Sequence, residues 1–262
     1  MNIFKNKLEK IISNQFVYDM FIRSKMLKPS YFKKMTLKYN PDDLSSEYYE
    51  KIKERKWELE HQIGRLTNFK KIIEHCASLK GDFVEFGCYR GFSVLWTAYL
   101  AERNAIFRKI IGLDGFTGLP YSDDEFRKGR FADTTPKKCL NNIIKSDEIY
   151  DETKKNIYIG KYLYKEKGRI LKYFKKLNVE KFCFIHIDCD VSQSAREIFD
   201  ILVEGDLMAD QCYILYDDYG IEQKLRDMIH EFNEKMKQKW DIEEHSKTRF
   251  TKNYFFSKKV TI

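Results

Sequence analysis

The chain has 262 residues, a length that suits one large α/β domain with an extension better than two complete domains. Hydrophobic residues make up 43% of it and aromatic residues 15%, enough apolar surface for a sizeable core, which excludes a wholly disordered chain. The 48 Lys and Arg residues against 40 Asp and Glu residues leave a formal charge of +8, which favours an anionic partner such as nucleic acid, a membrane surface or a phosphate-bearing small molecule.

Residues 1–60 are predicted to form a helical extension. Apolar side chains recur there at near-helical spacing, with basic residues between them. A helix packed on the domain or on a second subunit accounts for this pattern better than a helix on a membrane surface, so membrane contact is not favoured. We expect the extension to cover the mouth of a substrate site or to form the contact of a homodimer.

The sequence predicts neither a signal peptide nor a transmembrane helix, because no stretch approaches ~18 uncharged apolar residues. The cysteines form no C-x-x-C pair, which argues against a zinc ribbon and a disulfide framework. We therefore expect reduced thiols in a cytoplasmic protein. The six cysteines are Cys76, Cys88, Cys139, Cys183, Cys189 and Cys212.

From residue 81 onward, short apolar runs alternate with longer amphipathic stretches, a pattern typical of βα units. It predicts an α/β domain over residues 61–262, with a mostly parallel sheet flanked by helices. In such sheets ligands bind beyond the carboxyl ends of the strands. Five strands are expected at 83–86, 110–113, 157–159, 182–187 and 213–216, and a sixth and seventh at 240–245 and 254–256.

A glycine-bearing turn follows the first expected strand, with Gly87 and Gly91 leading into a helix. Glycine permits close approach of the backbone to a ligand, and a helix N-terminus favours polar or anionic groups. The pattern is not the G-x-G-x-x-G fingerprint of dinucleotide binding. Asp114 follows the second strand, where a carboxylate either accepts the two hydroxyls of a ribose or caps a loop.

Four aspartates follow the next two expected strands, Asp188 and Asp190 after one and Asp217 and Asp218 after the other. Their mutual repulsion requires either that several are protonated or that a cation lies among them. Oxygen ligands favour a hard ion, Mg²⁺ before Mn²⁺ or Ca²⁺, and argue against zinc. The alternative is that these residues are helix caps and solvated loop aspartates.

A histidine within an expected strand and a basic stretch each have a structural explanation that does not involve catalysis. His186 alternates with apolar neighbours, so we expect a hydrogen-bonded core residue rather than a catalyst. The stretch 161–176 carries seven Lys or Arg residues against Glu166 alone, and is either a solvated helix face or an edge that attracts a phosphorylated substrate. The sequence contains no Gly-x-Ser-x-Gly elbow and no Walker-type lysine loop, which disfavours hydrolases and nucleotidases.

Four motifs together resemble the macrocin O-methyltransferase family: residues 83–91, 113–120, 186–190 and 216–220. The resemblance covers about residues 60–220. It implies a class I S-adenosylmethionine-dependent methyltransferase domain with a Rossmann-like, seven-stranded sheet, and metal-dependent methylation of a sugar hydroxyl. It also implies that Asp114 holds the ribose, that Phe116 lies beside the adenosine, and that Asp188, Asp217 and Asp218 bind Mg²⁺. The residues implied around the methionine end of the cofactor are Glu85, Gly87, Tyr89, Arg90, Gly91 and Ser93.

The sequence departs from the family pattern at two places. Residues 191–194 read Val-Ser-Gln-Ser where family members continue with Leu-Tyr-Glu-Ser, and no histidine occurs between Phe116 and Tyr150 to serve as a base. Asp188 or Asp190 is therefore the expected catalytic base, unless a residue of a mobile 121–135 loop takes that role. The loop candidates are Asp123, Asp124 and Glu125.

The sequence thus predicts methylation of a nucleotide-linked or lipid-linked sugar. A catechol or phenol O-methyltransferase is the alternative enzyme, since a metal centre needs only two adjacent oxygens on its substrate. A scaffold that has kept the fold and lost the chemistry is the non-catalytic alternative. Nucleic acid is not expected as a substrate, because the acidic strand ends would face its phosphates.

Overall fold

The computed structural model describes residues 65, 68–248 and 251–259. The chain divides into two compact units, of which one comprises residues 64–144 and 149–262 and the other residues 1–63 with 145–148. The first of these units holds all the strands described below. The predicted helical extension of residues 1–60, and the substrate-mouth or homodimer contact expected of it, lie outside the described residues.

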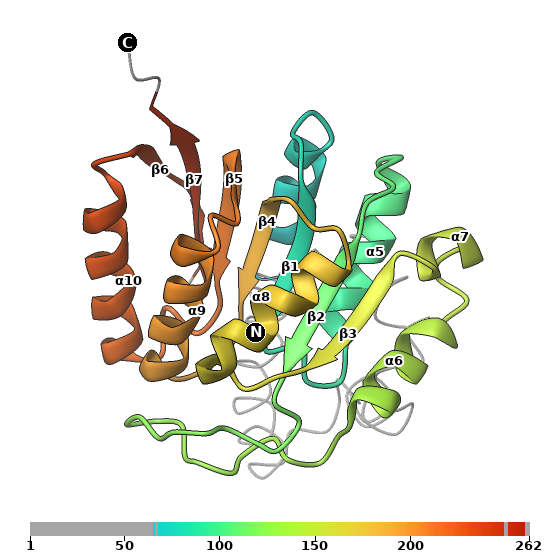
Figure 1. Ribbon diagram of the computed structural model, residues 1–262, viewed down its shortest axis with the longest axis horizontal. Helices are drawn as coiled ribbons and strands as arrows, with labels where there is room; N and C mark the ends of the chain where they lie inside the picture. Colours follow the sequence, from blue (N-terminus) through green and yellow to red (C-terminus); the bar gives the residue numbers. More distant parts are fainter. Residues whose placement is uncertain (1–64, 66–67, 249–250, 260–262) are drawn as a thin grey trace, which may run out of the picture. The chain divides into compact units, whose positions relative to one another are not determined.

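A seven-stranded sheet forms the centre of the larger unit, in the order β3-β2-β1-β4-β5-β7-β6 (Figure 1). Strands β1 to β5 are parallel, and β7 runs antiparallel to both β5 and β6. The predicted seven-stranded, mostly parallel sheet is confirmed. The strands are β1 Asp82–Phe86, β2 Ile110–Asp114, β3 Ile157–Lys161, β4 Phe182–Ile187, β5 Met208–Tyr216, β6 Trp240–Lys247 and β7 Lys252–Lys258.

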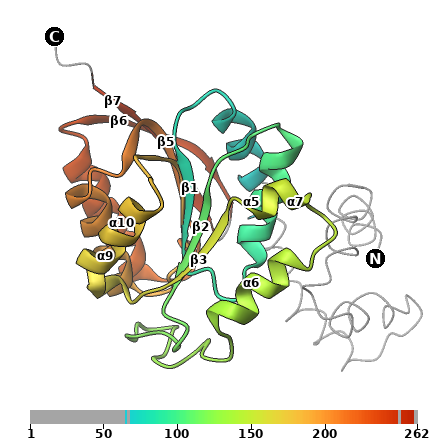
Figure 2. The ribbon, with the colours of Figure 1, turned by 45° about the vertical axis from the view of Figure 1, so that its right-hand side comes forward.

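Helices cover both faces of the sheet. Figure 2 shows α5, α6 and α7 on one side and α9 and α10 on the other. Residues 68–76 are also helical, and Phe69 packs edge-on against Phe184 of β4. The helices are α5 Phe92–Arg103, α6 Pro136–Ile144, α7 Asp151–Lys154, α8 Lys167–Lys176, α9 Ser192–Glu204 and α10 Gln223–Met236, with a 3₁₀ turn, η1, at Tyr164–Glu166.

The core lies along the central strands. Every residue of β4 is buried, and so are four of the five residues of β1. Strands covered by helices on both faces need mostly apolar residues, and here Glu85 of β1 and His186 of β4 are the buried polar exceptions. Among the described residues, no helix combines the length and the apolar character needed to cross a lipid bilayer.

The strand order creates one position where the chain changes direction across the sheet. From β1 the chain proceeds outward through β2 to β3, and then returns to place β4 on the other side of β1. The helices that follow β1 and β4 lie on opposite faces of the sheet (Figure 2), and the carboxyl ends of two such strands are where open α/β sheets bind ligands.

Candidate active site

The turn from β1 into α5 contains two glycines, and at both positions neighbouring atoms leave no room for a side chain. Gly87 has a φ of +98°, and a Cβ there would lie 1.6 Å from the backbone oxygen of Asp188. Gly91, the N-cap of α5, has a φ of +84°, and a Cβ there would lie 2.8 Å from Cδ1 of Ile143. The turn therefore passes close against β4 and α6. Most N–H groups of the turn bond within the protein, those of Gly87 and Cys88 to the backbone oxygen of Leu113, so it is the first turn of α5 that favours a polar or anionic ligand.

Glu85 and His186 form a buried polar pair next to this turn. They are in register on β1 and β4, and Nδ1 of His186 lies 3.4 Å from Oε1 of Glu85. Ser93 of α5 donates a hydrogen bond to the same carboxylate oxygen. Oε2 of Glu85 and Nε2 of His186 have no hydrogen-bond partner within the described residues. His186 is a core residue, as predicted, but its ring lacks the expected hydrogen bonds, so the pair offers polar atoms to a ligand.

Asp114 joins the loops that follow β1 and β2. Its Oδ2 accepts the backbone N–H of Tyr89 at 2.9 Å, and its Oδ1 accepts that of Phe116 at 2.6 Å. Both partners have positive φ, 42° and 51°, so the carboxylate stabilises two strained turns. Burial raises the pKa of Asp114, although these two hydrogen bonds oppose the rise. Asp114 is thus a loop cap, and each oxygen keeps a second lone pair for a ribose hydroxyl.

Tyr89 and Arg90 direct their side chains to Asp133, in the segment between β2 and α6. The Tyr89 hydroxyl donates to Asp133 at 2.5 Å, and the Arg90 guanidinium pairs with the same carboxylate. Burial and the bond to Asp133 raise the pKa of Tyr89 to about 12, while the same bond, together with Arg90, lowers the pKa of Asp133. Both residues were expected beside the methionine end of the cofactor. In this structure they tie the glycine turn to the neighbouring loop.

Aspartates meet beyond the ends of β4 and β5, as predicted. Single carboxylate oxygens of Asp188, Asp190 and Asp218 lie within 4.8 Å of one another. Asp190 and Asp218 have φ values of +62° and +52°, strained conformations that cluster at functional sites. Burial raises the pKa of Asp188 and of Asp190, and neighbouring carboxylates raise both further. Three converging oxygen donors fit a hard divalent cation.

Arg65 supplies a cation that the sequence reasoning missed. Its Nη1 donates to Oδ2 of Asp188 at 2.9 Å and to Oδ2 of Asp217 at 2.8 Å. Burial alone would lower the pKa of Arg65, but the charges of Asp217 and Asp188 outweigh it and raise the pKa. The metal ligands expected from the sequence were Asp188, Asp217 and Asp218. In the structure Asp217 contacts Arg65 instead, and the carboxylate that lies beside Asp188 and Asp218 is that of Asp190.

A sequence signal for Arg65 existed. Phe69, Ile72, Ile73 and Cys76 are fully buried at helical spacing, and Arg65 stands four positions before Phe69 in the sequence, the spacing of one helical turn. A lone charge on an otherwise apolar helical stripe must find a buried partner. This signal indicates that Arg65 is buried beside a carboxylate, without indicating which one.

The segment 115–135, between β2 and α6, runs along the carboxyl edge of the sheet (Figure 1) and is hydrogen-bonded to neighbouring elements there. The hydroxyl of Tyr121 donates to Glu197 of α9 at 2.5 Å. The backbone N–H of Glu125 donates to Oε2 of Glu222, a residue only 1% exposed that precedes α10, at 3.1 Å. We expected a mobile loop over 121–135. These contacts instead anchor it to the helices that follow β4 and β5.

Two of the three candidate bases in this loop bond elsewhere, and the third is exposed. Oδ2 of Asp123 accepts the backbone N–H of Ser192, the first residue of α9, at 2.6 Å, so Asp123 caps that helix. Asp124 forms an exposed ion pair with Lys224 at 2.9 Å. Glu125 is exposed. Of the expected bases, Asp188 and Asp190 are the two that lie in the aspartate cluster.

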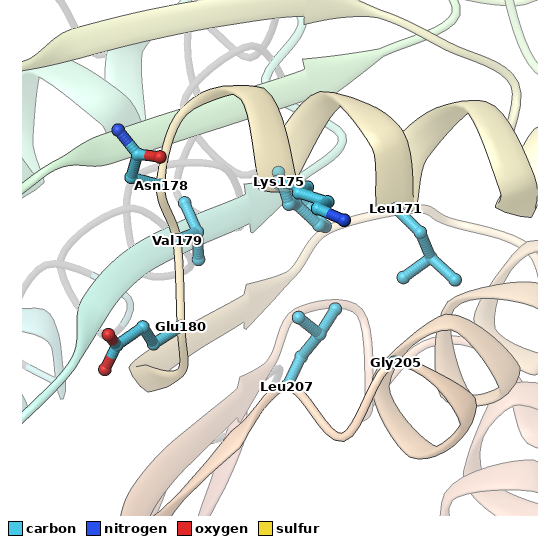
Figure 3. Close-up of a pocket in the computed structure, with 8 residues that line it drawn as sticks. Leu171, Lys175, Asn178, Val179, Glu180, Gly205 and Leu207 are labelled. Carbon is cyan, nitrogen blue, oxygen red and sulfur yellow. The ribbon is translucent and has the colours of Figure 1, made fainter.

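A separate pocket of about 430 Å³ lies at the opposite edge of the sheet, where β4 and β5 begin (Figure 3). Lys175, from the basic stretch 161–176, lines it. Because α8 runs toward that edge, the basic residues at its end lie away from the aspartate cluster. The lining residues are Leu171, Phe174, Lys175, Asn178, Val179, Glu180, Gly205 and Leu207.

Comparison with known proteins gives one family and several structures of the same fold. The model of the macrocin-O-methyltransferase family matches residues 9–249. The structure of the O-methyltransferase NovP is 16% identical, covers 75% of this chain and 81% of its own, and superposes with a TM-score of 0.59. The calicheamicin methyltransferase CalS11 is 13% identical, covers 74% and 79%, and gives 0.55. At these identities the likeness concerns the fold. A search of curated proteins found no match.

Proposed function

The chain belongs to the macrocin-O-methyltransferase family, and from that premise we propose that it methylates a sugar hydroxyl with the help of a divalent cation. Family membership makes it an S-adenosylmethionine-dependent O-methyltransferase. The observation that carries the proposal is the meeting of the glycine turn, Asp114 and the aspartate cluster at one edge of the sheet. This arrangement supports a donor site and a cation site next to each other.

We assign S-adenosylmethionine, which supplies the methyl group, to the carboxyl ends of β1 and β2. The partnerless Oε2 of Glu85 and the amides at the start of α5 suit the polar methionine end. Asp114 has the lone pairs to accept the ribose hydroxyls, and Phe116 would lie beside the adenosine. The residues assigned to the methionine end are Glu85, Gly87, Tyr89, Arg90, Gly91 and Ser93.

We assign a divalent cation, Mg²⁺ by the preference of oxygen donors, to Asp188, Asp217 and Asp218. Asp188 and Asp218 already lie together, with Asp190 as their neighbour, while Asp217 faces Arg65. Four aspartates and one arginine leave an excess of negative charge, which supports cation binding. A bound cation would act as a Lewis acid that lowers the pKa of the acceptor hydroxyl.

We assign removal of the hydroxyl proton to Asp190, with Asp188 as the other candidate. Burial and the charge of Asp188 raise the pKa of Asp190, and a carboxylate with a raised pKa is a stronger proton acceptor. The remaining task of the chain is orientation, because an in-line methyl transfer depends on holding donor and acceptor in line. The caps that Asp114 and Asp123 provide would fix the loops around the reacting groups.

We propose that the sugar is carried on a phosphorylated group, as in a nucleotide sugar. Three basic residues of the loop between β2 and α6, Arg127, Lys128 and Arg130, are exposed and form no ion pair within the described part of the chain. Arg130 is close enough to oppose the rise in the pKa of Asp190. A positive strip beside the acidic cluster suits a phosphate attached to a sugar.

Calorimetric titration of S-adenosylmethionine, in Mg²⁺ and in chelator, tests the donor site. We expect micromolar affinity, which corresponds to about 8 kcal/mol of binding free energy. Methyl transfer from labelled donor to a panel of nucleotide sugars and catechols then tests the acceptor. We expect transfer to a nucleotide sugar in Mg²⁺, loss of transfer in chelator, and a loss of at least 100-fold in Asp218→Asn, which keeps the size of the side chain and removes its charge.

Each result points to a different revision. Donor binding with transfer to catechols alone would replace the sugar by a phenolic acceptor. Transfer that is unaffected by chelator would remove the cation from the proposal. Absence of donor binding in both buffers would make the chain a scaffold with the methyltransferase fold.

A further inference from the structure

Arg65 is the one buried guanidinium in contact with the aspartate cluster within the described residues. It is 8% exposed, and its Nη1 bridges Asp188, after β4, and Asp217, after β5. The bridge joins the carboxyl ends of two neighbouring strands through a single nitrogen atom. Arginine stays protonated in such surroundings, and here the two carboxylates raise its pKa against the effect of burial. The cluster therefore contains a permanent positive charge that belongs to the chain.

The carboxylate of Asp217, which Arg65 contacts, lies outside the group that the other three aspartates form. Asp188, Asp190 and Asp218 contribute oxygens to one group, and Asp217 contributes none to it. Asp217 is 2% exposed, and a carboxylate this deeply buried is stabilised by the guanidinium of Arg65, 2.8 Å from its Oδ2. Arg65 thus compensates the aspartate that the family resemblance implies as a metal ligand.

We propose that Arg65 is a built-in counter-ion, which neutralises Asp188 and Asp217 when no divalent cation is bound and competes with that cation for the same carboxylates. The inference rests on the proposed function, because it takes the cluster to be a cation site. Binding of a divalent cation next to a fixed guanidinium is opposed by like-charge repulsion, unless Arg65 moves and releases both Oδ2 atoms. Arg65 is in this sense a positioning residue that sets cation affinity and keeps the empty site folded.

The test compares full-length wild type with Arg65→Met, which keeps much of the side-chain volume and removes the charge. Two quantities are measured without donor or acceptor: the affinity for Mg²⁺ by calorimetry, and the melting temperature in chelator and in saturating Mg²⁺. In Arg65→Met we expect affinity for Mg²⁺ to rise about 10-fold or more, because the competing charge is gone. We also expect it to melt below wild type in chelator and to recover most of that loss in Mg²⁺.

Three further variants make the result specific. Arg65→Lys keeps the charge, so its affinity for Mg²⁺ should stay within a few-fold of wild type. Arg65→Gln is neutral but can still donate a hydrogen bond; it should show the same rise in affinity as Arg65→Met and serves if the methionine variant does not fold. Arg108→Met removes a part-buried arginine at the other edge of the sheet, where Nη1 bonds the backbone oxygen of Cys76 at 3.1 Å. Its loss of stability should not be recovered by Mg²⁺.

Unchanged or weaker Mg²⁺ binding in both neutral variants would overturn the proposal and leave Arg65 a purely structural residue. The same holds if Mg²⁺ fails to restore the melting temperature of the folded variants. Failure of the proposed function looks different. In that case wild type would bind S-adenosylmethionine but no Mg²⁺ at all, or would bind neither.

Discussion

Gly87 combines a positive φ with the closest approach of two strand ends in the site. Alanine at this position would have to keep φ near +98° and place its Cβ 1.6 Å from a backbone oxygen that cannot move aside. We expect Gly87→Ala to lower the free energy of unfolding by about 3 kcal/mol or more, from strain and overpacking together. Urea denaturation measures the loss.

Gly129 provides the matched control, since its φ is +85° but no heavy atom lies within 4 Å of the place that a Cβ would occupy. Gly129→Ala should cost only the conformational strain, about 1 kcal/mol. Equal losses in the two variants would show that the contact with Asp188 does not determine the requirement for glycine.

Asp114 should make stability depend on pH in a defined direction. Its pKa is raised in the folded state by burial, against the hydrogen bonds from Phe116 and Tyr89. A carboxyl group with a raised pKa contributes stability that is fully present below its unfolded pKa and is lost as pH rises through the folded pKa. The stability of wild type relative to Asp114→Asn should therefore fall as pH rises above about 4, the ordinary pKa of an aspartate, until the folded group has lost its proton.

Denaturant unfolding of both proteins across that interval measures the difference. The asparagine variant does not titrate at this position, so its own pH dependence subtracts the contribution of every other group. A stability difference that grows in favour of wild type as pH rises would contradict the raised pKa. It would mean that the two backbone hydrogen bonds outweigh the burial of the charge.

At the scale of elements, the N-terminus of α9 depends on a residue from a distant part of the chain. Asp123 accepts the N–H of Ser192 at 2.6 Å, a cap supplied across the carboxyl edge of the sheet. Asparagine at this position would keep an acceptor oxygen in the same place, whereas alanine would not. We expect Asp123→Ala to lose about 1 kcal/mol of stability and Asp123→Asn to lose much less.

The same two variants distinguish two possible roles of Asp123, as the N-cap of α9 and as the catalytic base. If Asp123 only caps α9, Asp123→Asn should transfer methyl groups at a rate close to that of wild type. If its carboxylate removes the acceptor proton, the asparagine variant should be nearly inactive although it is stably folded. Melting temperature and methyl-transfer rate, measured on one preparation, distinguish the two roles.

The strands that the sequence predicted best are those buried on both faces. Residues 182–187 are apolar except for His186, are all buried, and were predicted with their true bounds. Strand β5 begins at Met208, five residues before the predicted start at 213. The prediction started late because Asp210 and Gln211 are exposed and interrupt the apolar run. Backbone pairing with β4 and β7 extends the strand over residues whose side chains give no strand signal.

The candidate site was predictable where chemistry follows directly after a strand. Asp114, Asp188, Asp190, Asp217 and Asp218 all lie at the carboxyl edge, because a parallel sheet brings these ends together. Arg65 and the docking of the 121–135 loop were missed. Both are contacts between segments far apart in the chain, and neither apolar periodicity nor motif spacing encodes which distant carboxylate a buried arginine meets.

At the scale of the whole molecule, the net charge of +8 is distributed unevenly around the site. Arg127 and Arg130 are exposed in the loop beside the aspartate cluster, whereas Lys175 and Lys176 end α8 at the opposite edge of the sheet. Both pairs contribute equally to the net charge. Of these four residues, Arg130 is close enough to the cluster to act on the pKa of Asp190, and exposed charges farther apart than about 8–10 Å are largely screened.

We therefore expect the double variant Arg127→Gln, Arg130→Gln to raise KM for a nucleotide sugar about 10-fold or more at low ionic strength, with a smaller effect on kcat. Added salt should raise KM of wild type more than that of the variant, because the lost attraction is the part that salt screens. The matched double variant Lys175→Gln, Lys176→Gln, with the same net charge, should leave KM unchanged.

If the lysine variant raises KM as much as the arginine variant does, the attraction comes from the net charge of the molecule and not from the loop. If neither pair raises it, the sugar is recognised without a phosphorylated carrier.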